Sequence, residues 1–283
     1  MANGMENFWD SLSGNEAASA ESMIEELRGA PWSELLLRDV RINGGVVEAN
    51  KDRLFELRFA HALHAAGVMP YEVPGEGGST IDFGFTSNGQ PCAVELLRLG
   101  ETQAVEAATA TRVDEDGVRW SGRILRTDAA DQRQSLEGET LKAVQRICQK
   151  CEAGGQPHKF SAQQGVLHAI LVDFRTFSNG GDVYDRVHIA LGGPFVPERY
   201  RLRWEGRVIT GVFDDGTQVK GAAEARQRVH FLGFTHERTY GPGELPHVTQ
   251  FIANPHLFPD AAAVRAAIAT WPLQPAEVIN RGD

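Results

Sequence analysis

Residues 79–99 read STIDFGFTSNGQPCAVELLRL. The Asn88-Gly89 pair within this stretch predicts a tight β-hairpin, because both central residues of a type I′ turn need a positive φ. With this pair at the tip, the two strands bring three pairs of apolar residues opposite one another: Phe85 with Cys92, Phe83 with Val94, and Ile81 with Leu96. Side chains alternate between the two faces of a strand, so these residues are expected to form one apolar face.

The same register places Asp82 directly opposite Glu95. Facing Cβ atoms in such a pair lie about 4.5–5.5 Å apart, and like charges at that distance are destabilising. A divalent cation between the two carboxylates would offset the repulsion, and the small Gly84 and Ala93 beside them leave space for a metal and a substrate. The alternative is a polar outer face on which each carboxylate pairs with its own Arg or Lys.

A third carboxylate lies on a helix predicted for residues 50–67. Asn50 suits the N-cap and Gly67 suits the position after the last turn. Glu56 shares a helix face with apolar residues such as Phe59 and Leu63. A buried Glu needs a partner, so we expect Glu56 to face either a metal ion or an internal Arg.

The order of elements predicts an α/β (α+β) protein with a mixed β-sheet flanked by helices. A second helix is expected at 135–153, followed by a strand at 165–177 that is apolar enough to be buried on both faces. Three segments follow from this order: an N-terminal helical segment (1–48), a core (49–177), and a C-terminal extension of the sheet or small second lobe (178–283). The remaining expectations are a frayed start at 1–20, a helix at 21–28, an insertion at 104–134, strands at 187–191, 199–213 and 227–234, and a helix at 260–271.

The order of these elements resembles that of the PD-(D/E)XK nuclease superfamily, which has the restriction-endonuclease-like fold. An inward Glu on a first helix is followed by a strand with Asp, a strand with Glu, a helix and a strand. Ile81-Asp82 stands for P-D, and after twelve residues Glu95-Leu96-Leu97 stands for (D/E)-X-K. The resemblance implies that Asp82, Glu95 and the Leu96 carbonyl bind Mg²⁺ or Mn²⁺ and that Glu56 completes the catalytic site. It also implies metal-assisted hydrolysis of phosphodiester bonds in DNA, and by fold analogy a role in defence or repair.

The sequence departs from this motif at Leu97, which occupies the position of the lysine. A cation there would orient the attacking water and neutralise developing charge, and leucine does neither. Lys142 and Gln145 on the second helix and Arg98 on the strand are candidate substitutes, although Lys142 points away from the apolar stripe and Arg98 lies on the face opposite Glu95. The chain is therefore either an enzyme with a displaced cation or an inactive nuclease-like module that binds protein or nucleic acid. A cation within reach of Asp82 and Glu95 would favour the enzyme, and a closed apolar patch around Leu97 would favour the module.

Composition limits the partners. The chain has 283 residues, 42% of them hydrophobic, and a formal net charge of −10. The acidic balance argues against nucleic-acid binding through overall charge, and the lack of a long apolar run argues against a membrane partner. Three cysteines cannot build a disulfide framework, which indicates a reducing cytoplasm. A homodimer or a partner protein remains compatible with the sequence.

A local basic patch is still expected in the C-terminal part. Arg199, Arg201 and Arg203 alternate with Tyr200, Leu202 and Trp204, which as a strand gives one cationic and one apolar face. Arginine binds phosphate oxygens in a bidentate manner, so these three residues are candidate nucleic-acid contacts. The alternative is a solvated outer face of a sheet.

Overall fold

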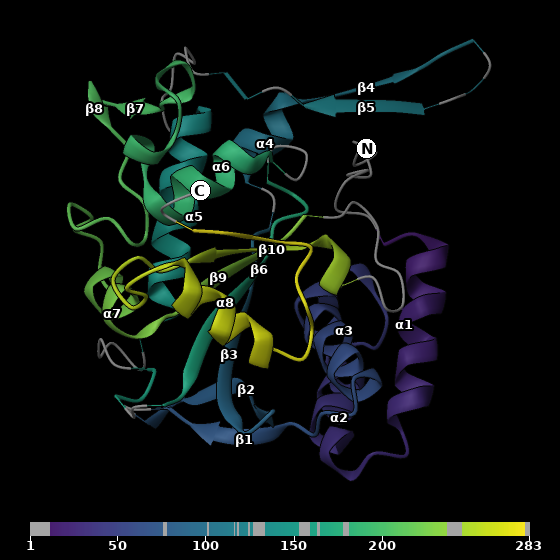
Figure 1. The fold of residues 1–283 in the computed structure, drawn as a ribbon. Coiled ribbons are helices and arrows are strands. Elements are labelled where there is room, and N and C mark those ends of the chain that lie inside the picture. The colour runs from purple at the N-terminus through teal and green to yellow at the C-terminus, as the bar shows by residue number, and fades with distance from the viewer. Residues whose placement is uncertain are drawn as a thin grey trace.

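The computed structural model describes residues 12–75, 78–100, 102–115, 117, 119–123, 125–126, 134–152, 159–162, 165–177, 181–236 and 245–280. Over these residues the chain is an α/β protein with eight α-helices and a seven-stranded mixed sheet (Figure 1). The sheet consists, in spatial order, of β1 (Tyr71–Pro74), β2 (Thr80–Ser87), β3 (Gln90–Arg98), β6 (Leu167–Asp173), β9 (Phe231–Thr235), β10 (Thr249–Ala253) and β11 (Glu277–Ile279). The helices are α1 (Gly14–Leu27), α2 (Glu34–Ile42), α3 (Lys51–Ala65), α4 (Gln103–Ala108), α5 (Leu136–Gln149), α6 (Val183–Leu191), α7 (Ala222–Arg228) and α8 (Ala261–Thr270).

Two further pairs of strands lie outside the main sheet. The first is the antiparallel hairpin of β4 (Thr109–Val113) and β5 (Arg119–Arg123), which projects from the body of the molecule (Figure 1). The second is the two-residue pair of β7 (Arg203–Trp204) and β8 (Arg207–Val208).

Strand direction changes along the main sheet. The first three strands, β1 to β3, are antiparallel to one another, whereas β6 runs parallel to both β3 and β9. The chain leaves β3, passes through α5 and returns in β6, and every residue of β6 is buried. The C-terminal strands β9, β10 and β11 continue the same sheet.

Helices cover both faces of the sheet and divide the core into two layers. One layer packs α1, α2, α3 and α8 against the sheet, and it includes the aromatic contacts of Phe59 with Phe83 and of Phe85 with Trp271. The other layer packs α5, α6 and α7 against the opposite face. Because β3 and β6 lie between the two layers, side chains from either set of helices can reach these central strands.

The predicted hairpin register is confirmed near the turn. Phe83 pairs with Val94 and Phe85 with Cys92, and both turn residues have positive φ, 50° at Asn88 and 78° at Gly89. The prediction for Ile81 is wrong, because this side chain packs in the α5 layer instead of beside Phe83. At that end of β2 the backbone pairs with β1, where Ile81 faces Val73.

Three other expectations about elements are wrong or hold only in part. The segment 187–191 lies within α6, where Asp182 caps the helix by accepting hydrogen bonds from the N–H groups of Tyr184 and Asp185. Residues 199–213 contain a turn of 3-10 helix at Glu198–Tyr200 and the short strands β7 and β8. Residues 14–20 are helical, because α1 begins at Gly14 after a capping box on Ser13, whereas 1–11 lie outside the described residues.

Candidate functional site

Asp82 and Glu95 come together where the two strands of the hairpin separate. The Leu96 N–H donates to Asp82 Oδ2 at 2.7 Å, and the Asp82 N–H donates to Glu95 Oε1 at 3.2 Å. Side-chain oxygens thus replace backbone carbonyls as acceptors beyond the last backbone pair, Phe83 with Val94. The opening in the ladder holds both carboxylates, with Glu95 fully buried and the Asp82 side chain 23% exposed.

Two lysines bind this pair of carboxylates. Lys150, the residue at the C-cap of α5, places Nζ 3.1 Å from Glu95 Oε2 and 3.5 Å from Asp82 Oδ2. Lys159 places its Nζ 2.7 Å from Glu95 Oε1. The side chain of Lys150 is 27% exposed, so the cluster is open to solvent on the side of Asp82 and Lys150.

Burial and charge shift the pKa values of this cluster. Burial, and after it the charge of Asp82, raises the pKa of Glu95, although both lysines oppose the change. Burial on its own would lower the pKa of Lys150, but Asp82 and Glu95 more than offset it and leave that pKa raised. Lys150 therefore carries its proton at neutral pH and supplies a positive charge between the two carboxylates.

Glu56 lies within electrostatic range of the same cluster. Its pKa is raised by burial, and both Asp82 and Lys150 contribute to the shift with opposite signs. Its carboxylate accepts two hydrogen bonds from Arg53, at 2.7 Å and 2.6 Å. The partner of Glu56 is thus an arginine one turn earlier on α3, and this arginine is 41% exposed instead of internal.

The motif position that should hold lysine is part of the core. Leu97 is 6% exposed and packs in the same cluster as Val144 and Ile147 of α5. Arg98 is directed elsewhere, toward Asp52 and Asp173. The substitutes suggested by the sequence do not bind the carboxylates either: Lys142 pairs with Glu139 at 2.7 Å, and Gln145 is exposed.

The two carboxylates are ligands of the type that a hard divalent cation prefers, and the two lysines balance their charge in the structure. Mg²⁺ commonly binds through one or two carboxylates and keeps several waters, and Asp82 and Glu95 supply two carboxylates at one point. No group of three or more His, Cys, Asp or Glu side chains placed to hold a metal occurs among the described residues. A metal at this site would therefore depend on Asp82, Glu95 and a backbone oxygen such as that of Leu96, and it would have to displace the Lys150 ammonium.

The three arginines expected on one strand line a separate cleft, and of the three only Arg203 belongs to a strand, β7. Arg199, Arg201 and Arg203 all line this cleft, which has a volume of about 560 Å³ and lies beside α6. The guanidinium of Arg199 lies 4.7 Å from the ring centre of Tyr200, and Arg201 Nε donates to the Val196 carbonyl at 3.0 Å. The prediction of one cationic strand face is wrong because this segment is not a continuous strand.

The sequence held a signal for Lys150 but none for Lys159. Lys150 follows Ile147 by three residues and precedes the buried Cys151, so it continues the apolar stripe of α5 toward the sheet. Lys159 lies outside regular secondary structure, and its position depends on tertiary packing.

Comparison with known proteins finds no matching family model, no matching curated protein and no matching solved structure. Among the described residues, no helix has the length and hydrophobicity that a bilayer span requires.

Proposed function

We propose that this protein is a divalent-metal-dependent nuclease of the PD-(D/E)XK type that hydrolyses phosphodiester bonds in DNA. The observation that carries the proposal is the position of Lys150, whose ammonium lies 3.1 Å from Glu95 and 3.5 Å from Asp82. It provides from α5 the cation that Leu97 cannot provide from β3. A displaced cation within reach of both carboxylates is the feature that favours an enzyme.

The topology around the site supports the same proposal. The helix with Glu56 (α3), the strand with Asp82 (β2), the strand with Glu95 (β3), then α5 and a parallel β6 follow one another in the order of a restriction-endonuclease-like core. The strands that come later, β9 to β11, extend this core on the far side of β6. We place the protein in the cytoplasm, since all three cysteines are buried free thiols, and a role in defence or repair is part of the proposal.

Each residue of the cluster has a distinct part in the proposed reaction. Asp82 and Glu95, with the Leu96 carbonyl, would hold Mg²⁺ or Mn²⁺, which would supply an activated water and stabilise charge on the phosphoryl oxygens. Lys150, which lies 3.1 Å from Glu95 and 3.5 Å from Asp82, would orient the attacking water and neutralise the charge that develops. Lys159 keeps Glu95 in place through its 2.7 Å contact, and Glu56 extends the acidic site toward the surface.

The test is cleavage of plasmid and single-stranded DNA with Mg²⁺ or Mn²⁺. Wild type is compared with Asp82→Asn, Glu95→Gln and Lys150→Met. We expect both carboxylate variants to lose cleavage and Lys150→Met to lower the rate about 10²–10³-fold, the usual effect of removing one well-placed charge stabiliser. Arg265→Met, an exposed arginine of α8, is the matched control. Equal cleavage by wild type and Glu95→Gln would show that the activity does not come from this site.

The second candidate is an inactive nuclease-like module that binds protein or nucleic acid. The observation that favours it is the closed environment of Glu95, which is fully buried and accepts from both lysines and from the Asp82 N–H. Leu97 also packs in the core as such a module would require. Absence of cleavage in wild type, together with retained binding of a partner in Glu95→Gln, would favour this candidate.

A further inference from the structure

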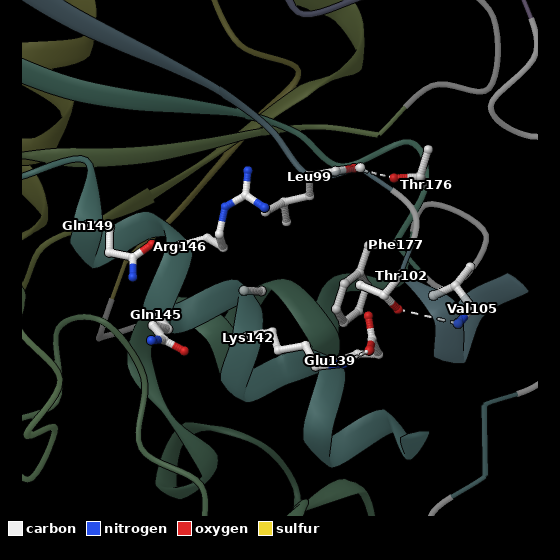
Figure 2. Close-up of a pocket in the computed structure, with 12 residues that line it drawn as sticks. Leu99, Thr102, Val105, Glu139, Lys142, Gln145, Arg146, Gln149, Thr176 and Phe177 are labelled. Atoms are coloured by element: carbon white, nitrogen blue, oxygen red, sulfur yellow. Dashed lines mark hydrogen bonds and ion pairs between the residues drawn. The ribbon is translucent and has the colours of Figure 1, made fainter. Parts of the chain in front are cut away.

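A pocket lies at the carboxyl ends of the parallel strands β3 and β6, beside α5 (Figure 2). Its volume is about 290 Å³. The residues that follow the two strands form one wall, with Leu99 and Thr102 after β3 and Phe177 after β6. In α/β proteins, ligands bind preferentially in crevices at the carboxyl ends of parallel strands.

The interior of the pocket is apolar and partly aromatic. Leu99, Val105, Ala143 and Phe177 line it and are all buried. The Phe177 ring stacks on Phe174 with ring centres 4.4 Å apart, which fixes its orientation. A flat apolar ring would gain contact area and stacking in this space.

The rim is polar and carries a net positive charge. Lys142 and Glu139 neutralise each other at 2.7 Å, and Gln145 and Gln149 present amide groups. Arg146 is exposed, and within the described parts of the chain no hydrogen bond or ion pair involves its guanidinium. Figure 2 shows the Arg146 side chain extending over the pocket toward Leu99.

The pocket and the carboxylate cluster lie along one helix. Arg146 precedes Lys150 by four residues on α5, so the two side chains lie on the same side of the helix. Four residues correspond to a rise of about 6 Å along the helix, a distance that two neighbouring nucleotides of one nucleic-acid strand can span. A strand bound at Arg146 would therefore continue toward Asp82 and Glu95.

We propose that this pocket takes an unstacked nucleobase of single-stranded nucleic acid, with Arg146 bound to the adjacent phosphate. The inference rests on the proposed function and names the substrate class. An apolar aromatic wall suits the face of a base, the amides of Gln145 and Gln149 suit its polar edge, and a guanidinium suits a phosphate. Because paired bases are stacked inside a duplex, the pocket selects a single strand or a frayed end.

The experiment measures binding in EDTA, so that cleavage does not interfere, by fluorescence anisotropy with the full chain. The probes are a labelled oligothymidylate of about 15 nucleotides, which is long enough for a typical single-strand site, its duplex with oligodeoxyadenylate, and an abasic strand of equal length. We expect the single strand to bind most tightly. Arg146→Gln should weaken this binding about tenfold and lower its salt dependence by about one phosphate contact, whereas Arg265→Gln should leave it unchanged.

The abasic strand tests the base itself. The abasic strand should bind wild type several-fold more weakly than oligothymidylate does. When Arg146 is replaced, the affinity for the abasic strand should fall by no more than the affinity for the intact strand. Tighter binding of the duplex, equal binding of the abasic strand, or equal effects of the two arginine substitutions would overturn the inference. If the protein binds single strands in this way but shows no metal-dependent cleavage, the inference about the pocket stands and the proposed nuclease activity is overturned. If the protein cleaves DNA and Arg146→Gln does not change the rate at low substrate concentration, the nuclease activity stands and the inference about the pocket is overturned.

Discussion

Two clusters of opposite charges within the described part of the chain differ in their exposure and in their composition. Glu16 of α1 binds Arg175 after β6, and both side chains are almost completely buried, at 3% and 1% exposed. In the second cluster, two carboxylates, Asp82 and Glu95, share the ammonium of Lys150, and the outer members are about one quarter exposed. The first cluster joins a helix to the sheet as a closed pair, whereas the second sets like charges side by side next to solvent.

This difference separates a structural ion pair from a site. The Glu16–Arg175 pair holds together two segments far apart in the sequence, and both of its side chains are almost completely shielded from solvent. The carboxylates of Asp82 and Glu95 repel each other, and the backbone ladder of the hairpin is interrupted to accommodate them. The ammonium groups of Lys150 and Lys159 offset this repulsion in the structure, and a divalent cation in place of Lys150 would offset it as well.

The largest expected effect concerns the closed pair. Arg175→Met removes a cation that the buried Glu16 carboxylate binds, and breaking a buried ion pair in this way costs about 3–5 kcal/mol. Urea unfolding followed by circular dichroism measures the loss. The double variant with Glu16→Leu should recover part of the stability, because it removes both charges but also the Glu16 acceptor of the capping box on α1. A loss below about 1 kcal/mol in the single variant would show that the pair contributes little.

The open cluster should respond differently, through its ligand. Asp82→Asn removes both the repulsion from Glu95 and the attraction to Lys150, so the metal-free stability should change by less than about 1 kcal/mol. Wild type should gain about 1.4 kcal/mol from Mg²⁺ at ten times its dissociation constant, and Asp82→Asn should gain nothing. Thermal unfolding with Mg²⁺ and with EDTA checks both statements. An equal gain in both proteins would place the metal elsewhere.

The pH dependence of stability sharpens the same comparison. The pKa of Glu95 is raised by burial and by Asp82, so the folded protein retains this proton to a higher pH than the unfolded chain. The folded state then binds more protons, and the free energy of unfolding falls as pH rises from about 4.5 through the raised pKa of Glu95. Below that window the contribution is fully present.

Comparison of wild type with Glu95→Gln isolates this contribution from other groups. Asp185, with a pKa raised by burial to about 6, titrates in the same window and cancels in the difference. In metal-free buffer, the stability of wild type relative to Glu95→Gln should decrease from pH 4.5 to neutral, and saturating Mg²⁺ should reduce the decrease because the metal favours the ionised carboxylate. A difference that stays constant with pH would contradict the assignment of the shift to Glu95.

Local chemistry explains which parts of this structure could be read from the sequence. The Asn88-Gly89 turn sets the register of the adjacent residues, and Ser135 and Asp260 cap α5 and α8 as their residue types suggest. The predicted register holds as far as Phe83 with Val94. Beyond it, Asp82 and Glu95 meet through side-chain hydrogen bonds and not as the predicted backbone pair. The register misplaced Ile81, because the interruption of the ladder depends on side-chain hydrogen bonds that no local pattern encodes.

Features that depend on distant segments could not be read. Lys159 reaches Glu95 only through the packing of a segment without regular structure. The alternation of Arg199, Arg201 and Arg203 has the period of a strand, but Pro197 and the turn of helix at Glu198–Tyr200 break it. In α6 the capping residue Asp182 was the informative signal, and the apolar run after it was misleading because buried helices and strands can share such a run.

The smallest expected effect concerns Arg53 and Glu56. They form a single pair of opposite charges, as Glu16 and Arg175 do, but the pair is partly exposed, as the cluster of Asp82, Glu95 and Lys150 is. Their contact is a partly exposed pair within one helix, 41% and 17% exposed, so Arg53→Gln should lower stability by no more than about 0.5–1 kcal/mol.

The hydrogen bonds from Arg53 hold down a pKa of Glu56 that burial otherwise raises. Without Arg53, Glu56 therefore stays protonated to a higher pH. If Glu56 belongs to the acidic site of the proposed nuclease, the acid limb of the cleavage rate should move to higher pH in Arg53→Gln, with the rate at alkaline pH little changed. In a protein that already carries Glu56→Gln, adding Arg53→Gln should not move the acid limb of the cleavage rate. An acid limb that stays in place in Arg53→Gln would assign Glu56 to a surface ion pair with no part in the reaction, leaving Asp82, Glu95 and Lys150 as the charged residues of the site.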